Sequence, residues 1–172
     1  MKKFLLALAF VFCAASVSAQ GWGLGARVNA GVQLQGEYTF SSENYLDGRL
    51  GINFPGGLEN YLDARLGVAF PEGLCLDLTV LYQWNIGKWD WTPKAGTWFF
   101  DAGVGAQAAL LLHDNGGLYA GVVGDAKFGI KFNKVPIKLA IDYTPGLGLM
   151  CTNGGGFKGS WFNFGLSCVY CF

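Results

Sequence analysis

The sequence predicts an all-β fold, an eight-stranded antiparallel up-and-down transmembrane β-barrel (a meander) that follows an N-terminal signal peptide. Three observations lead to this fold class. Apolar and polar residues alternate along eight segments, and a period of two indicates strands with one apolar and one polar face. Aromatic residues recur near the ends of these segments, as they do at the two interfaces of a membrane barrel. Finally, 52% of the residues are hydrophobic and only 14% are charged, against about 25% charged residues in typical soluble domains.

Residues 1–19 have the form of a secretory signal peptide. Two lysines precede an apolar run over residues 4–15, and small residues end the segment at Ala19. The run holds twelve residues, whereas a membrane-spanning helix needs about 20. We therefore expect cleavage after Ala19, which leaves residues 20–172 as the outer-membrane-type barrel domain. No later stretch is long and apolar enough for a spanning helix.

The first alternating segment covers residues 22–40, where every even-numbered residue is apolar or glycine. It allows two interpretations, because residues 29–31 have the composition of a three-residue turn, and such a turn keeps the alternation in phase. A hairpin at this point gives nine strands and places the two termini at opposite ends, which bacterial single-chain barrels avoid. We therefore predict one long first strand over residues 22–40.

The second and third segments, residues 46–54 and 62–70, lie in a tandem repeat. Residues 43–58 read ENYLDGRLGINFPGGL and residues 59–74 read ENYLDARLGVAFPEGL, with twelve of sixteen positions identical. Sixteen residues make one strand and one turn, so two consecutive copies in a meander run antiparallel to each other. The repeat therefore predicts two neighbouring strands of nearly the same sequence.

The Asp-x-Arg spacing makes the repeated unit complementary to its own reversed copy. With residues 55–57 as a three-residue turn, Asp47 lies opposite Arg65. In the same register, Arg49 lies opposite Asp63. Cross-strand pairs of opposite charge contribute about 0.2–1 kcal/mol each, so this register is the one that we predict.

Five further segments complete the predicted barrel, and they are residues 74–86, 98–112, 118–132, 135–149 and 162–172. Each is long enough for the about 9–11 residues that a tilted membrane strand needs. A soluble β-sandwich shows the same alternation and is the alternative fold. A sandwich, however, rarely places aromatic residues so regularly at the strand ends.

The polar faces of the segments carry nearly all of the charge, and in a membrane barrel this face lines the lumen. Isolated charges in a low-dielectric interior are costly, so we expect these residues to pair and to close the lumen. The predicted lumen ion-pair network comprises Arg27, Glu37, Asp47, Arg49, Asp63, Arg65, Asp77, Asp101, Asp125, Lys127, Lys138 and Asp142. The alternative is a narrow channel lined by Asp47, Asp63, Asp77, Asp101 and Asp125.

The aromatic residues predict two girdles, one at each membrane interface. The girdle on the side of the chain terminus comprises Trp22, Phe54, Trp84, Trp98, Phe100, Phe132, Tyr170 and Phe172. The second girdle comprises Tyr38, Phe40, Phe70, Phe162 and Phe164.

The last segment, SWFNFGLSCVYCF, places Tyr170 and the final Phe172 on its apolar face. This ending resembles the C-terminal signal by which outer-membrane barrels are recognised for insertion. Together with the signal peptide and the strand count, the whole mature chain resembles the small eight-stranded outer-membrane β-barrel families of Gram-negative bacteria, which include OmpX-like and OmpA-type transmembrane barrels. The resemblance implies a location in the outer membrane, contact with its lipid and lipopolysaccharide, and assembly by the barrel-insertion machinery. It implies an architecture and no particular activity.

Composition and motifs argue against several other functions. Lys and Arg number 12, as do Asp and Glu, and no basic block occurs, which argues against nucleic acid as a partner. Cys75, Cys151, Cys168 and Cys171 show no repeating spacing, so no disulfide framework is predicted. A single CxxC pair without a second does not make a zinc site, and no cofactor is implied.

The connections between segments carry no functional motif. If Phe172 is periplasmic, the outward connections are residues 41–44, 71–73, 113–117 and 150–159, and residues 87–96 lie on the periplasmic side. We therefore predict a closed, integral outer-membrane protein with a structural or surface-interaction role in the cell envelope. A narrow, porin-like passive channel is the alternative, and neither a ligand nor a protein partner follows from the sequence.

A lipid-modifying enzyme is the third alternative, because some small barrels use a serine, a histidine and an acid for this chemistry. The only histidine is His113, beside Asp114, and the predicted topology allows it to approach Ser41 or Ser42. No motif supports this arrangement, so we expect that the protein is not an enzyme.

Overall fold

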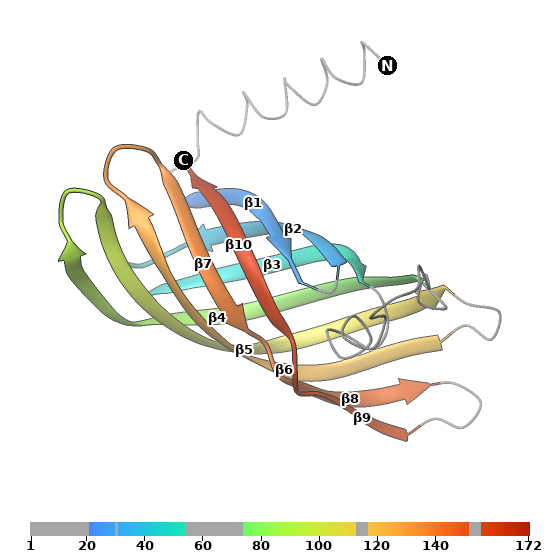
Figure 1. Ribbon diagram of the computed structural model, residues 1–172. Coiled ribbons are helices and arrows are strands. Elements are labelled where there is room, and N and C mark those ends of the chain that lie inside the picture. Colours follow the sequence, from blue (N-terminus) through green and yellow to red (C-terminus); the bar gives the residue numbers. More distant parts are fainter. Residues whose placement is uncertain (1–20, 30, 54–73, 113–116, 152–155) are drawn as a thin grey trace, which may run out of the picture.

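The computed structural model describes residues 21–29, 31–53, 74–112, 117–151 and 156–172. These residues form one antiparallel sheet that closes into a barrel (Figure 1). The strands are β1 (Trp22–Val28), β2 (Gly31–Thr39), β3 (Asn44–Asn53), β4 (Leu74–Thr92), β5 (Gly96–Leu112), β6 (Gly117–Phe132), β7 (Ile137–Tyr143), β8 (Gly146–Cys151), β9 (Gly156–Ser160) and β10 (Phe164–Cys171). Eight of these described strands, β1 to β7 and β10, form the closed ring, because β10 pairs with both β7 and β1. The predicted all-β class and eight-stranded antiparallel barrel are confirmed.

The segment predicted as one strand over residues 135–149 is interrupted in the middle. It forms β7 and β8, which pair with the two halves of β6 on either side of Thr144 and Pro145. Proline has no N–H to donate to a strand ladder, which accounts for the break. Thr144 is buried at the break, and β9 then continues the sheet from β8.

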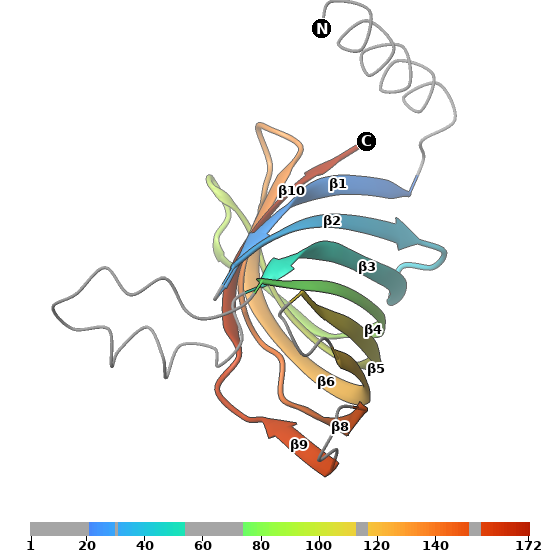
Figure 2. The same ribbon diagram turned by 90° about the vertical axis from the view of Figure 1, so that its right-hand side faces the viewer.

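The start of β1 and the end of β10 lie together at one end of the barrel, which we call the terminal end (Figure 1). There, the Phe172 N–H donates to the carbonyl of Trp22 at 2.8 Å. The β2–β3, β4–β5 and β6–β7 connections share this end, whereas the β1–β2 turn lies at the opposite, far end, which faces the viewer in Figure 2. Residues 87–96 lie at the terminal end, as predicted. Residues 41–44 also lie there, so the prediction that they face outward with the far connections is wrong.

Residues 22–40 form a hairpin and not the single long strand that we predicted. β1 and β2 pair antiparallel along the whole of β1. Asn29 caps the turn, because its side-chain Oδ1 accepts a hydrogen bond from the Gly31 N–H at 2.9 Å. Its own backbone N–H donates to the Gly31 carbonyl at 3.0 Å. The prediction was wrong because the turn leaves the alternation in phase, so the pattern of apolar residues does not reveal it.

β3 contains the first copy of the tandem repeat and is paired on both edges. It lies between β2 and β4 over residues 45–53, and Asp47 lies opposite Glu37 on one side and Leu81 on the other. A strand has only two edges, so the predicted register is wrong for β3. The pairs that are ruled out are Asp47 with Arg65 and Arg49 with Asp63. The predicted strand over residues 62–70 lies outside the described residues.

The outward face of the barrel is apolar. Leu34 on β2, Val122 on β6 and Ile141 on β7 are 66%, 63% and 60% exposed, respectively. These side chains alternate with inward side chains that are buried, as the pleat of a strand requires. Among the described residues, no helix reaches the length and apolarity that a membrane crossing requires.

Aromatic side chains form a girdle around the terminal end. The rings of Trp22 and Tyr38 lie 4.7 Å apart, and Tyr82 contacts both Phe40 and Trp84, at 5.6 and 4.8 Å between ring centres. Tyr38 and Phe40 therefore belong to this girdle, and the prediction that they lie at the opposite interface is wrong because the β1–β2 hairpin reverses the chain. The remaining predicted girdle residues divide into three groups. Those that lie toward the terminal end are Trp98, Phe100, Phe132, Tyr170 and Phe172, and those that lie toward the far end of β10 are Phe162 and Phe164. Phe54 and Phe70 lie outside the described residues.

Candidate functional site

Charged side chains line the interior of the barrel, and all of those described except Asp77 and Asp101 form ion pairs. The buried charged residues of the described strands are Arg27, Glu37, Asp47, Arg49, Asp77, Asp101, Asp125, Lys127 and Asp142, and each is at most 5% exposed. Lys138 joins them, with 12% of its side chain exposed. All ten belong to the predicted lumen set, whose other two members, Asp63 and Arg65, lie outside the described residues. We call the ten residues the lumen network.

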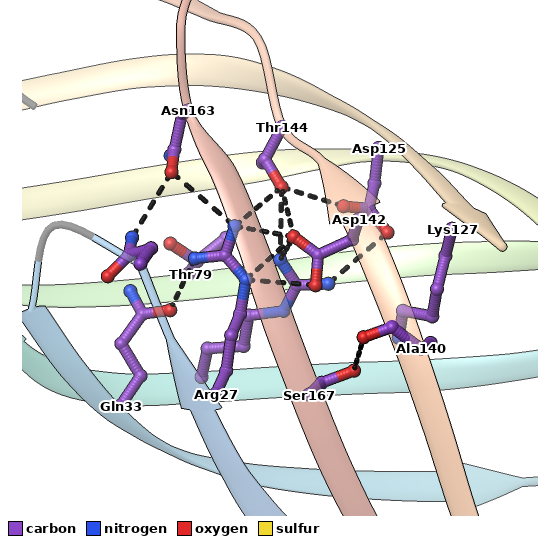
Figure 3. Close-up of polar contacts among 12 residues, drawn as sticks. Arg27, Gln33, Thr79, Asp125, Lys127, Ala140, Asp142, Thr144, Asn163 and Ser167 are labelled. Atoms are coloured by element: carbon purple, nitrogen blue, oxygen red, sulfur yellow. Dashed lines mark hydrogen bonds and ion pairs between the residues drawn. The ribbon is translucent and has the colours of Figure 1, made fainter. Parts of the chain in front are cut away.

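Arg27 and Asp142 form one centre of the lumen network, between β1 and β7 (Figure 3). The Arg27 Nε and Nη2 both donate to Asp142 Oδ1, at 2.7 and 2.5 Å. Arg27 Nη1 donates to the side-chain oxygen of Gln33 at 2.9 Å. A guanidinium that is held on two sides in this way is fixed in orientation, and charge-assisted hydrogen bonds are about twice as strong as neutral ones.

Arg49 forms a second centre, which joins β3 to β6. Its Nη2 lies 2.9 Å from Asp47 and 3.2 Å from Asp125, and its Nη1 donates to the Thr144 hydroxyl at 3.1 Å. Thr144 donates in turn to Asp125 at 2.7 Å. The strand break at Thr144 therefore supplies a hydroxyl at the point where a third contact to the arginine is needed.

Lys127 forms the third centre, which joins β6 to β2 and β3. Its Nζ lies 2.8 Å from Asp47 and 3.2 Å from Glu37. Glu37 also forms an ion pair with Lys138, whose Nζ lies 2.5 Å from Glu37 Oε2. Because Asp47 contacts both Lys127 and Arg49, the second and third centres form one connected unit.

Neutral polar side chains complete the lumen network, and the prediction from charges did not include them. Gln33 donates to Asp77 at 2.7 Å, and Gln83 donates to Asp125 at 2.5 Å. Gln33 and Gln83 occupy the same inward positions of their strands as the charged residues do, so the strand parity was the signal that could have found them.

A cavity of about 460 Å³ opens at the terminal end, and we call it the terminal vestibule. Its inner wall includes Tyr45, Phe99 and Asp101. The Lys138 Nζ lies over the rings of Tyr45 and Phe99, at 4.5 and 5.1 Å from the ring centres. Asp101 accepts hydrogen bonds from Tyr45 at 2.7 Å and from Asn85 at 2.6 Å. The vestibule therefore ends against side chains that already have polar or aromatic partners.

The lumen network spans the ring from one wall to the other. Its contacts connect β1 with β7, β3 with β6, and β6 with β2. An ion that crosses the lumen has to separate buried charges that are already paired, and an unpaired buried charge is costly. The arrangement is suited to closing the lumen and stiffening the barrel.

Of the residues of the alternative hydrolase site, only Ser41 and Ser42 lie in the described part of the chain. Ser41 and Ser42 line the terminal vestibule, whereas Leu112, at the end of β5, lies at the far end. His113 and Asp114, which follow Leu112, lie outside the described residues.

Cys75, Cys151, Cys168 and Cys171 are free thiols. The described residues contain no group of three or more His, Cys, Asp and Glu side chains that is arranged to hold a metal ion.

Comparison with known proteins places this chain in no family. No protein-family model, no curated protein and no solved structure matches it.

Proposed function

We propose that this chain is an integral outer-membrane β-barrel protein of a Gram-negative envelope, with a lumen closed by the lumen network and a structural or surface-interaction role. The observation that carries the proposal is the inverted distribution of side chains. Leu34 and Val122 are more than 60% exposed on the outside, while Arg27, Lys127 and Asp142 are at most 1% exposed inside. A soluble sandwich buries its apolar face and wets its polar face, so this distribution suits a barrel that is surrounded by lipid.

Substituting Val122→Arg tests the membrane proposal. Val122 lies on β6, six residues from Phe128, whose ring stacks on that of the girdle residue Trp98, and this places Val122 toward the middle of the apolar band. We expect the substitution to lower the stability of the barrel in lipid by about 2–4 kcal/mol, because that is the cost of an arginine at the midplane. The measurement is the amount of folded chain recovered in the outer-membrane fraction of Gram-negative cells, together with unfolding in lipid vesicles.

The matched control is Val135→Arg, in the turn between β6 and β7 at the terminal end, where the side chain is 45% exposed. This variant should behave as the original chain, because a charge at the interface costs about 0–1 kcal/mol. Equal behaviour of the two variants, or recovery of the original chain only from soluble fractions, would contradict the membrane proposal.

A planar bilayer measurement tests whether the lumen is closed. The refolded protein, residues 20–172, should show no steady conductance, because paired side chains from opposite walls fill the lumen. A parallel test of vesicle insertion, by protection from protease, shows that the silent protein is inserted. Steady conductance with an ion selectivity that changes in Arg27→Gln would establish the narrow channel in place of the closed barrel.

A further inference from the structure

The place of β3 in the barrel is defined by its inward side chains. Tyr45 donates to Asp101, and Asp47 and Arg49 carry two of the ion pairs of the lumen network. Gly51 lies at the next inward position. A segment that replaces β3 therefore has to present the inward series Tyr, Asp, Arg and Gly at alternate positions.

The second copy of the repeat presents this inward series without a change. Tyr61, Asp63, Arg65 and Gly67 stand sixteen residues after Tyr45, Asp47, Arg49 and Gly51, respectively. The four differences between the copies are Gly48 against Ala64, Ile52 against Val68, Asn53 against Ala69 and Gly56 against Glu72. Two of these four, at positions 48 and 52, fall on the outward face of β3, and the other two fall at its end or beyond it.

The glycines of β3 give a stricter test of the match. A Cβ at Gly48 would meet only the carbonyl of Gly36, at 3.9 Å, and the second copy has Ala64 at this position. A Cβ at Gly51 would collide with the backbone of the neighbouring strand β2, and the second copy keeps glycine there, as Gly67. The second copy therefore differs where the barrel has room and agrees where it has none.

The connections also permit the exchange. In the described barrel Asn53 lies opposite Cys75. With the second copy in place of β3, Ala69 lies opposite Cys75, which leaves residues 70–74 as a hairpin loop of an ordinary length. A shift of sixteen residues is even, so every side chain keeps its face.

We propose that the chain folds into either of two barrels, with residues 44–53 or residues 60–69 as the third strand. Both barrels have the same inward series of Tyr, Asp, Arg and Gly, and they differ in where the sixteen surplus residues emerge. With residues 44–53 in the sheet, the long connection follows the third strand at the far end. With residues 60–69 in the sheet, it precedes the third strand at the terminal end. The chain thereby presents the same segment on one side of the barrel or on the other, and this inference does not depend on the membrane location.

The choice between the two barrels is made during folding. Removing β3 from the finished sheet breaks its ladders with both β2 and β4, so the two forms do not exchange in the folded state without opening the ring. The populations are therefore kinetic products, and they persist after purification.

Cross-linking of the refolded full-length chain tests the proposal. With the native cysteines replaced by alanine, cysteine is placed at Leu78 and at either Leu50 or Leu66. Leu50 and Leu78 are partners in the β3–β4 register and both point outward, and Leu66 is the counterpart of Leu50 in the second copy. We expect a short thiol cross-linker to join Leu50→Cys to Leu78→Cys in one part of the protein, and to join Leu66→Cys to Leu78→Cys in a separate preparation. Absence of either product overturns the proposal.

Two deletion variants calibrate this experiment. Removing residues 59–74 leaves only the first copy and should give the cross-link from position 50, whereas removing residues 43–58 leaves only the second copy and should give the cross-link from position 66. Both variants should fold, because each retains one complete set of inward side chains. Failure of the second deletion variant to fold, while the first folds, also overturns the proposal.

Arginine substitutions provide an independent readout. Arg49→Leu and Arg65→Leu should each keep the folded yield within about twofold, because the other copy supplies the arginine, whereas the double variant should lose about a hundredfold in the folding equilibrium constant. A single Arg49→Leu variant that is as impaired as the double variant means that only the first copy enters the sheet. The reverse pattern, with Arg65→Leu alone fully impaired, means that only the second copy does. Either pattern overturns the proposal.

Discussion

Substituting Arg27→Met is expected to lower the free energy of unfolding by about 3–5 kcal/mol. The substitution removes the bidentate partner of Asp142 and leaves that carboxylate buried, with Thr144 at 3.4 Å and the more distant Arg49 at 3.9 Å as its remaining contacts. Arg27 has no counterpart in the tandem repeat, so no second copy can compensate for its loss. The measurement is unfolding by denaturant in detergent micelles, with tryptophan fluorescence as the signal that monitors the transition.

The double variant Arg27→Met with Asp142→Leu separates the ion pair from the shape of the site. It should regain most of the lost stability, because replacing both members of a buried pair with apolar side chains is often neutral or stabilising. Lys94→Met, on the exposed β4–β5 turn, removes a positive charge without touching the lumen and should change little. If Arg27→Met were no less stable than Lys94→Met, the lumen network would not contribute to stability as described.

Substituting Gly105→Val is expected to lower the free energy of unfolding by about 3 kcal/mol or more, or to prevent folding. A Cβ at Gly105 on β5 would collide with the carbonyl of Val80 and would lie 2.8 Å from the Cα of Leu81, both on β4. These are backbone atoms of one of the two longest strand pairings among the described residues, and they cannot move aside as the end of a side chain can. The measurement is the folded yield after refolding into detergent, with unfolding by denaturant for any protein that folds.

Gly36→Val on β2 is the matched control for this second substitution. A Cβ at Gly36 has no neighbour within 4 Å, so the variant should stay within about 0.5 kcal/mol of the original chain. Equal losses in the two variants would mean that strand propensity, and not the close approach of β4, makes glycine necessary at position 105.

The paired charges bear on function as well as on stability. They occupy the lumen, where a channel would have its constriction, and the terminal vestibule ends against them. If the lumen is closed, as we propose, the surfaces at the two ends are the places left for interactions with partners. The repeat adds a means of changing those surfaces, because the third strand has two candidate segments in one chain.

The strand alternation was sufficient for the fold class and for the orientation of side chains. Side chains in a strand repeat with a period of two, so the inward positions of Arg27, Lys127 and Asp142 could be assigned before any neighbour was known. The same rule placed Gln33 inside, although its lack of charge kept it out of the predicted network. The pairing of these residues could not be assigned, because Arg27 and Asp142 are 115 residues apart in the chain and meet only through the closure of β10 between β1 and β7.

The order of the strands in the sheet could not be predicted from alternation, because it is set by closure of the ring. One long strand over residues 22–40 with both repeats in the sheet gives eight strands, and so does a hairpin over residues 22–40 with one repeat in the sheet. Alternation is in phase for both, and both bring the two termini to the same end. The described barrel has the hairpin, in which Asn29 caps the turn, and β3 is paired with β2 on one edge and with β4 on the other. Alternation is a local property that assigns each residue to a face, whereas strand order and register are properties of the closed sheet, in which every edge must find a partner.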